Sequence, residues 1–339
     1  MSYLYLIDSN VKVGFRQGET VITHLVDGSE QRMPFAEIEG VSVFGMVQLS
    51  TRFVRECISS NVPVCYYSDN GHYFGMTSSS LHVNPVRQKR QVYLTDDEEF
   101  CLQWARTVVD AKIRNSLALL ESFDAAYSLT EEDTEGLRHS LANLQYAETV
   151  DMANGFEGNA AKCYFRCLSK AIQPAGLKFR ARSTRPPKDP FNSMLSFGYS
   201  ILYRNIIGAI ERHGLHPYFA FMHRSRLGHA ALASDLIEEL RAPLVDRVVM
   251  ELANSGEVDE DDFEPNESGA VYMKRGLMRR LTSMISETLV KGRPFFSAYG
   301  DSRSYGFQVM LDRKIDSAID AIDNGDAALY NPYIWETET

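Results

Sequence analysis

The chain has 339 residues, 44% of them hydrophobic and 24% charged, which is the composition of an ordinary soluble globular protein, and its formal net charge is −10. No run approaches the roughly 18 apolar residues that a transmembrane helix needs, and the N-terminus lacks the basic region and cleavage site of a signal peptide. We therefore expect a cytoplasmic protein with no membrane partner. Its five scattered cysteines do not suit a disulfide framework and are expected to be reduced.

A β-rich region is predicted for about the first 80 residues, because short β-branched or aromatic runs alternate there with turn residues. One helix interrupts this region: Ser50 or Thr51 can cap the segment TRFVRECISS, whose apolar residues share one face. The expected strands lie within YLYLID, VKVGF, TVITHLV, VSVFG, VPVCYYS and HYFGM.

Helical patterning replaces the strand pattern after about residue 91, where apolar residues recur at spacings of three and four between Leu102 and Leu120. It continues to about residue 323, with breaks expected at Asn154–Gly155, 183–190, 213–217 and 257–267. We predict an α+β fold with two domains, a small β-rich N-terminal domain at 1–85 and a larger all-α domain at 86–339. A dinucleotide-binding pattern and a glycine-rich phosphate loop are both absent from the sequence.

Charge is segregated along the chain, so the net value hides a basic segment suited to phosphate groups. Between Lys170 and Lys188 there are six basic residues and no acidic one, whereas 257–267 holds seven acidic residues and no basic one. Prolines make the stretch GLKFRARSTRPPK a loop, so its cations are expected to face solvent. Phe179 lies among them, as in surfaces that track a nucleic-acid backbone. A merely solvated loop explains the same pattern.

An acidic pair and three of the eight histidines lie within HPYFAFMHRSRLGHAALASDLIEELR, residues 216–241. The pattern predicts a helix that begins near 229–231. Asp235 then neighbours Glu238 at i,i+3 and Glu239 at i,i+4, so spacing does not choose between the two glutamates. Structural explanations are also available, since Asp-x-x-Glu is a capping-box pattern and His223 could be a hydrogen-bonded core histidine.

Glu157 opens a second candidate segment, EGNAAKCYF at 157–165. The Asn154–Gly155 pair before it predicts a helix that begins near Glu157. A carboxylate in the first turn of a helix is stabilised by the helix dipole, which is a purely structural reason for a glutamate at this position.

Together these segments resemble the CRISPR-associated spacer-acquisition family, the larger of the two CRISPR adaptation proteins (Cas-one). EGNAAKCYF is similar to its EG-x-x-A-x-x-YF element, and RPPKDPFNSMLSFGYSILY to its Arg-x-Pro-Pro-x-Asp-x-x-Asn-x-x-Leu-x-x-Gly-Tyr element. GLHPYFAFMHR and LASDLIEELRAPLVDRVV resemble its Gly-Leu-x-Pro-x-x-Gly-Phe-x-His and Leu-x-x-Asp-x-x-Glu-x-x-Arg elements, and AKIRN at 111–115 fits a weaker pattern. Ala220 departs from the usual glycine before Phe-x-His.

The resemblance implies a set of site residues. Glu157, His223 and Glu238 match the family's catalytic ligands for a divalent metal, Mn²⁺ or Mg²⁺, and Asp235 would support them. Further residues lie near positions that contact DNA or belong to basic segments expected to bind it: Tyr199, Tyr203, Lys178, Arg180, Arg182, Arg185, Lys188 and Arg224.

The resemblance also implies a reaction and partners. A homodimer formed through the β-rich domain, bridged by the smaller CRISPR adaptation protein (Cas-two), would insert short double-stranded DNA fragments into a CRISPR array. The 3′-hydroxyl of the incoming DNA is the nucleophile in strand transfer, so the protein needs a metal-dependent endonuclease and integrase centre rather than a nucleophilic side chain.

Two other functions are carried as alternatives. One is a catalytically idle DNA-binding scaffold of the same fold, which the presence of the complete ligand set disfavours. The other is a small-molecule metal hydrolase that uses His216, His223 and His229, and it predicts zinc binding and no affinity for DNA.

Overall fold

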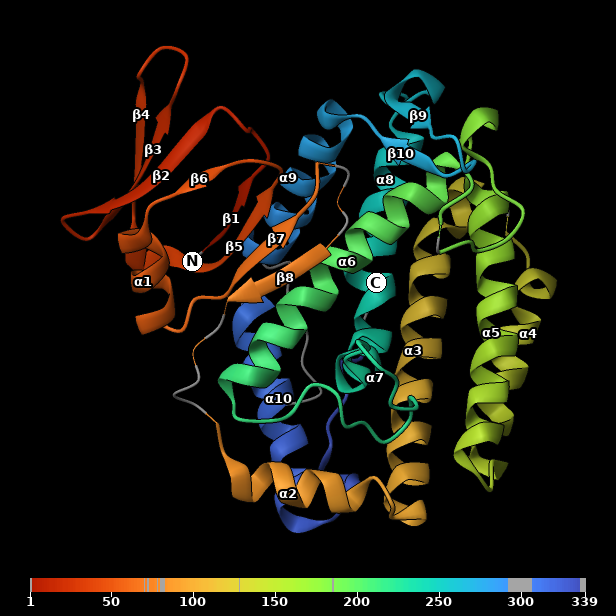
Figure 1. Cartoon of the computed structure of the whole chain (residues 1–339). Helices are drawn as coiled ribbons and strands as arrows, with labels where there is room; N and C mark the ends of the chain where they lie inside the picture. Colours follow the sequence, from red (N-terminus) through yellow and green to blue (C-terminus); the bar gives the residue numbers. More distant parts are fainter. Residues whose placement is uncertain are drawn as a thin grey trace.

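The structure is a computed structural model, and it describes residues 2–69, 71, 73–77, 79, 83–127, 129–184, 186–291 and 307–335. The predicted α+β fold is confirmed: strands come first in the chain, and the C-terminal part is mostly helices (Figure 1). Within the described ranges, none of the helices is long and apolar enough to cross a membrane.

The N-terminal part contains two four-stranded sheets, with strand orders β1-β5-β7-β8 and β4-β3-β2-β6. In the first sheet β1, β5 and β7 are parallel, and β8 runs antiparallel to β7. The predicted helix is present as α1, and the Ser50 hydroxyl caps it by accepting a hydrogen bond from the Phe53 amide at 3.2 Å. The bounds are β1 Ser2–Leu6, β2 Val11–Arg16, β3 Glu19–His24, β4 Glu30–Pro34, β5 Ile38–Phe44, β6 Gln48–Leu49, α1 Thr51–Ser59, β7 Val64–Tyr67 and β8 Tyr73–Thr77.

Two strands of the N-terminal part were missed by the sequence pattern. The strand β4 reads EQRMP and is mostly exposed, because it lies at the edge of its sheet and buries no side chain there. The other, β6, is only two residues long. Hydrophobic alternation finds strands that cover a core, so it does not detect an exposed edge strand.

The C-terminal part is mainly helical, although one short hairpin, β9–β10, interrupts it where an all-α region was predicted. The hairpin begins within the acidic segment 257–267, which was expected to be a loop. The bounds are α2 Pro85–Leu94, α3 Glu98–Tyr127, α4 Glu131–Asn143, α5 Val150–Ala171, α6 Pro190–Arg212, α7 Ala231–Ile237, α8 Arg247–Asn254, β9 Phe263–Pro265, β10 Val271–Met273, α9 Arg275–Lys291 and α10 Phe307–Asn324.

The predicted break at Asn154–Gly155 is wrong. Helix α5 begins at Val150, where the Thr149 hydroxyl accepts a hydrogen bond from the Met152 amide at 3.2 Å, and it continues through the glycine to Ala171. Its buried face, packed against α3 and α4, outweighs the cost of Gly155 and Gly158, which is about 1 kcal/mol for each glycine in a helix interior. Glu157 therefore lies about two turns inside the helix. The helix dipole acts on the first turn, so dipole stabilisation does not account for a carboxylate at this position.

Helices α7 and α8 belong to one helical rod with an irregular middle. The predicted helix start near 229–231 is confirmed by α7. Between α7 and α8 the chain forms a 3₁₀ turn, Glu238–Leu240, and a π-helical turn, Arg241–Asp246. Pro243 lies in this stretch and has no amide hydrogen to continue the regular pattern.

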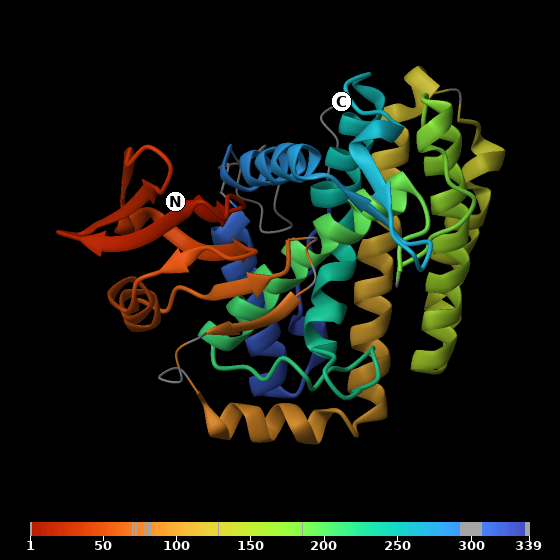
Figure 2. The ribbon, with the colours of Figure 1, turned by 45° about the horizontal axis from the view of Figure 1, so that its top comes forward.

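The sheet β1-β5-β7-β8 packs against helices of the C-terminal part, and the long helices α3, α4 and α5 lie on the far side of the molecule (Figure 2). The Phe44 ring stacks on Tyr67, with centroids 4.6 Å apart, and lies 5.7 Å from Phe197 of α6. All three belong to one apolar core that extends across the proposed boundary at residue 85. That boundary stays a prediction.

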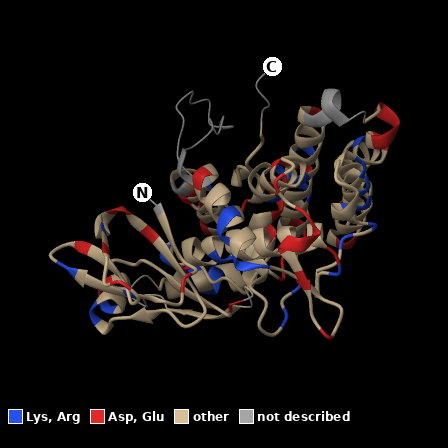
Figure 3. Ribbon diagram, turned by 90° about the horizontal axis from the view of Figure 1, so that it is seen from above, with Lys and Arg blue, Asp and Glu red and all other residues tan. Residues whose placement is uncertain are grey.

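Acidic and basic residues are interspersed along the ribbon rather than divided between two halves of the molecule (Figure 3). Segregation along the chain therefore does not produce one acidic and one basic half. Any anion-binding surface has to come from local groups of Lys and Arg, as electrostatic attraction to phosphate requires.

Candidate metal and nucleic-acid site

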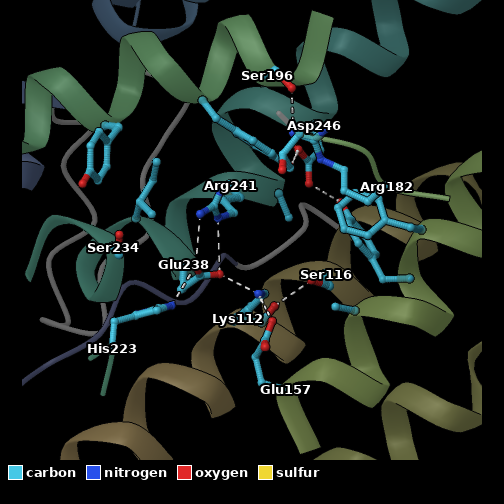
Figure 4. Close-up of a pocket in the computed structure, with 18 of the residues that line it drawn as sticks. Lys112, Ser116, Glu157, Arg182, Ser196, His223, Ser234, Glu238, Arg241 and Asp246 are labelled. Atoms are coloured by element: carbon cyan, nitrogen blue, oxygen red, sulfur yellow. Dashed lines mark hydrogen bonds and ion pairs between the residues drawn. The ribbon is translucent and has the colours of Figure 1, made fainter. Parts of the chain in front are cut away.

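A cavity of about 730 Å³ opens between α3, α5, α6 and the irregular rod that begins with α7. It is lined by all three proposed metal ligands, which come from three different elements of the chain (Figure 4). Glu157 comes from α5, His223 from the loop before α7, and Glu238 from the 3₁₀ turn after it. The cavity also contains arginines, which gives it both acidic and basic walls: Arg182, Arg204, Arg224, Arg226 and Arg241.

Asp235 is completely buried and holds His223 in place. Its Oδ2 accepts hydrogen bonds from the Phe221 and Met222 amides, both at 3.0 Å, and its Oδ1 accepts one from the His223 amide at 2.9 Å. Oδ1 also lies 2.8 Å from His223 Nδ1. These bonds go to a neighbouring loop and not to the start of Asp235's own helix, so the capping-box explanation does not apply.

The hydrogen bond to Asp235 also selects a tautomer of His223. With the proton on Nδ1 donated to Asp235, Nε2 keeps its lone pair, and it lies 4.0 Å from Glu238 Oε1 at the cavity wall. Burial disfavours the charged imidazole, but Asp235 and Glu238 more than offset it and raise the pKa of His223.

Glu238 and Glu239 point in different directions, which spacing along the helix could not reveal. The Glu238 carboxylate faces the cavity, 2.5 Å from Lys112 Nζ and 3.1 Å from an Arg241 nitrogen. Burial opposes its charge, but Arg241 and Lys112 hold the pKa of Glu238 well below its usual value. The Glu239 carboxylate is buried outside the cavity, where Lys314 and the Tyr330 hydroxyl contact it.

Glu157 and Glu238 meet at one side chain, Lys112 of α3. The Lys112 ammonium forms ion pairs with both carboxylates and thus bridges α3, α5 and the 3₁₀ turn. Lys112 was not identified as a site residue from the sequence, although it is the lysine of AKIRN. The AKIRN element places this lysine on a helix, but it does not show that the lysine pairs with Glu157 and Glu238 from other elements.

The donor set fits a hard divalent cation in its chemistry. Two carboxylates and one imidazole with a free Nε2 suit Mn²⁺ or Mg²⁺, and Lys112 marks a point between the carboxylates where positive charge is stabilised. In the part of the chain that the structure describes, no three His, Cys, Asp or Glu side chains already lie close enough together to hold a metal ion. Metal binding would therefore require these side chains to draw together.

A buried polar group lies behind the ligands. The Tyr164 hydroxyl donates to Asp246 Oδ2 at 2.7 Å, and the Tyr199 hydroxyl donates to Asp246 Oδ1. Arg241 and Arg182 pack over the Tyr199 ring, with their guanidinium carbons 4.5 and 5.3 Å from its centroid. Tyr199, proposed to lie near DNA, therefore lines the cavity with its hydroxyl already engaged.

Tyr203, the second proposed supporting tyrosine, also lines the cavity. Its hydroxyl donates to the Ala230 carbonyl at 2.9 Å, which ties α6 to the residue before α7. Both tyrosines thus hold elements of the cavity wall together.

The basic loop is organised differently from the prediction. Arg182 is half-buried and turned toward the protein, where its guanidinium donates to Asn192 Oδ1 at 2.7 Å and to the Ser196 hydroxyl at 3.1 Å. Phe179 does not lie among exposed cations: it is buried and stacks on Phe191, 4.9 Å between centroids. Arg185 lies outside the described residues.

Four of the proposed DNA-binding cations do face solvent. Arg224 lines the cavity and forms an exposed ion pair with Asp151 at 2.8 Å. The other three, which are exposed on the loop after α5 and do not line the cavity, are Lys178, Arg180 and Lys188.

The three histidines of residues 216–241 do not converge. His216 lies outside the cavity, where its amide donates to Gln91 Oε1 at 2.9 Å. His229 lines the cavity wall and lies 3.1 Å from the Ser234 hydroxyl through Nε2. A three-histidine zinc centre is therefore not built by these residues.

Comparisons with known proteins agree with the architecture. A model of the family described as CRISPR associated protein Cas1 matches residues 4–287. The chain is 37% identical over 326 residues to the CRISPR-associated endonuclease Cas1 of Mycobacterium tuberculosis (strain CDC 1551 / Oshkosh), which covers 96% of this chain and 95% of that protein.

Two solved structures share the fold. A casposase bound to integration product has a TM-score of 0.82 at 22% identity, covering 100% of this chain and 96% of that one. A chain of a Cas6-RT-Cas1–Cas2 complex has a TM-score of 0.81 at 23% identity, and it covers all of this chain, which spans 36% of that longer one. The ordered sequence elements, the fold and the match over most of the chain lead to one conclusion: the protein belongs to the Cas1 family of CRISPR-associated proteins.

Proposed function

We propose that this protein is a divalent-metal-dependent DNA endonuclease and integrase that inserts short double-stranded DNA fragments into a CRISPR array. The observation that carries the proposal is the convergence of Glu157, His223 and Glu238 on one arginine-lined cavity. The endonuclease relative, 37% identical, and the likeness in fold to a casposase bound to integration product support it.

Glu157, His223 and Glu238 would hold Mn²⁺ or Mg²⁺, which supplies a Lewis acid to polarise the scissile phosphate and favour ionisation of the attacking 3′-hydroxyl. The chain's own contribution is orientation and charge. Asp235 keeps the imidazole turned with Nε2 toward the cavity, and Arg241 fixes Glu238 through two nitrogens, at 3.1 and 3.3 Å. Such prepositioned charges stabilise a phosphoryl-transfer transition state without any protein nucleophile.

The site assignment is tested by His223→Ala with His216→Ala as its matched control. We expect His223→Ala to lose Mn²⁺-dependent strand transfer by at least about 100-fold while the protein stays folded and still binds DNA. His216→Ala should retain strand transfer, because His216 lies outside the cavity. Full strand transfer by His223→Ala, or by Glu157→Ala, would disprove the assignment.

A catalytically idle scaffold is the alternative, and it predicts DNA binding with no cleavage or joining in any metal. A plasmid-integration assay in Mn²⁺, Mg²⁺ and EDTA separates the two functions. Products that form in metal and vanish in EDTA support the integrase, whereas tight DNA binding without products in every condition supports the scaffold.

We further propose that the protein acts in the cytoplasm as a homodimer joined through its β-rich part, with Cas2 as its partner. The edge strand β4 leaves backbone groups available for pairing or coverage by a second copy. Likeness in fold to a chain of a complex that contains Cas2 supports the partner. Sedimentation velocity at micromolar concentration tests the dimer, and a monomeric profile would contradict it.

A further inference from the structure

Lys112 occupies the space between the two proposed carboxylate ligands. Its Nζ lies 2.5 Å from Glu238 Oε2 and also contacts Glu157 Oε1. The three side chains are largely shielded from solvent, with exposed fractions of 17% for Lys112, 22% for Glu157 and 6% for Glu238. Three separate elements of the chain therefore meet at one ammonium group.

The pairing balances the charge of this part of the cavity. Two carboxylates, Glu157 and Glu238, face two cations, Lys112 and Arg241. A buried carboxylate that loses its partner is strongly destabilising, so Glu238 needs a cation beside it at all times.

The two cations are held in different ways. Arg241 binds Glu238 through two nitrogens and packs over the Tyr199 ring, so its guanidinium is fixed. Lys112 reaches the carboxylates at the end of a flexible four-carbon stem, and its ammonium is a compact point charge. Lys112 is therefore the cation that can withdraw without disturbing the backbone of α3.

We propose that Lys112 is a displaceable internal cation, which keeps Glu157 and Glu238 together before metal binds and leaves the space between them when a divalent cation enters. The proposal rests on the proposed function, because it takes these two carboxylates as metal ligands. One ammonium and one divalent ion cannot share the same pair of oxygens, since like charges repel strongly at such distances. Lys112 is in this sense a positioning residue that sets metal affinity.

The exchange also changes the charge of the cavity. When a divalent ion takes the place of the ammonium between Glu157 and Glu238, the charged Lys112 side chain remains nearby. The two carboxylates then face more positive charge than they neutralise. The negative charge of a phosphodiester would reduce this excess, so metal and DNA should bind cooperatively. Lys112 thereby links metal binding to the presence of an anionic substrate.

The test compares Lys112→Met with Lys314→Met as a matched control. Lys314 is also buried and pairs with the next glutamate, Glu239, outside the cavity. We expect both variants to unfold at a lower temperature in EDTA, because each leaves a buried glutamate without its lysine. Mn²⁺ should restore the unfolding temperature of Lys112→Met only, since only Glu238 can take the metal in place of the lysine.

Mn²⁺ affinity, measured by electron paramagnetic resonance of the free ion, gives the second readout. We expect Lys112→Met to bind Mn²⁺ at least about tenfold more tightly than the wild type, because a neighbouring positive charge has been removed, and Lys314→Met to be unchanged. Lys112→Arg, which keeps the charge, should bind no more tightly than the wild type. Equal or weaker Mn²⁺ binding by Lys112→Met would overturn the proposal while leaving the proposed function intact.

Lysine acetylation followed by mass spectrometry tests the exchange in the wild-type protein and does not depend on any variant folding. Lys112 should react slowly in EDTA and at least about threefold faster in Mn²⁺, once its ion pairs are released, whereas Lys314 should stay protected in both. Reactivity of Lys112 that Mn²⁺ leaves unchanged would overturn the proposal. Absence of any Mn²⁺ binding by the wild-type protein would instead overturn the metal site of the proposed function, and this inference with it.

Discussion

At the scale of single residues, the role of each acidic side chain in the site depends on the groups that it contacts. Asp235 uses both carboxylate oxygens to hold the backbone and ring of His223, so it supports the site and does not face the cavity itself. Adjacent glutamates likewise separate by orientation, Glu238 toward Lys112 and Glu239 toward Lys314. Identical residue types thus take different roles because the backbone turns between them.

The first residue-scale prediction concerns the pKa of His223 in the metal-free protein. Because Asp235 and Glu238 raise it, histidine NMR titration should give a value above the usual value of about 6.5. In Asp235→Asn, the larger of the two carboxylate contributions is removed, so the pKa of His223 should be lower than in the wild type. A value that is unchanged by Asp235→Asn would mean that Asp235 does not govern this group.

The sign of the pH dependence is set by the same shift. A pKa raised by folding means that protonated His223 contributes stability below its unfolded pKa of about 6.5, and that this contribution is lost as the pH rises through the folded value. Metal binding requires the neutral ring and has the opposite dependence. Mn²⁺ affinity should therefore increase as the pH rises through the folded pKa, which a calorimetric titration series can measure.

At the scale of elements, the cavity depends on how closely α6 approaches the irregular rod. Gly198 of α6 has no side chain there, and a Cβ at this position would lie 2.6 Å from Val245 Cγ1 and 3.3 Å from Ile285 Cδ1. The π-helical turn that carries Asp246 is thus packed against α6 at a glycine. This contact helps to place Asp246 beside Tyr199.

Two glycine substitutions separate packing from helix propensity. Gly198→Ala should lower the free energy of unfolding by about 1–3 kcal/mol, because the added methyl group overpacks the contact with Val245. Gly155→Ala, at an exposed position of α5 with no atom near the new Cβ, should raise it by about 0.5–1 kcal/mol. Urea denaturation measures both, and a neutral Gly198→Ala would show that α6 and the rod can move apart freely.

At the scale of the whole molecule, a net charge of −10 means that the proposed DNA binding has to rely on local groups of cations. The structure separates two such groups, the arginines inside the cavity and the exposed cations of the loop after α5. Arg182, the inward-facing member of that loop, contributes to the cavity wall instead of the outer surface.

Salt dependence of DNA affinity tests the exposed group. Neutralising the three outward loop cations together should reduce the slope of log K against log salt by up to about 0.9 per cation that contacts a phosphate. The residues are Lys178, Arg180 and Lys188.

A matched control neutralises three exposed cations of the β-rich part and should leave the slope unchanged. These residues are Lys12, Arg16 and Arg32. If the slope is the same in both triple variants and in the wild type, the loop is merely solvated and takes no part in DNA binding.

Much of the fold could be predicted from the sequence, because local periodicity encodes it. Short β-branched or aromatic runs between turn residues predicted the buried strands, and a capping residue followed by a one-sided apolar face predicted α1. The helical apolar stripe of Leu102–Leu120 predicted α3. The misses have physical causes: β4 buries nothing and leaves no pattern, while α5 continues through Gly155 because tertiary packing outweighs a weak local preference.

Residue type and spacing within a few turns were enough to establish the family resemblance, the order of most elements and the residues proposed as ligands. Three-dimensional packing was needed to show that Glu238 and not Glu239 faces the cavity, that Arg182 folds inward, and that Lys112 lies between two glutamates from different elements. Glu157 and Glu238 are far apart in the chain, and neighbours of that kind are set by helix packing. Packing is a property of the whole fold, and no local pattern records it.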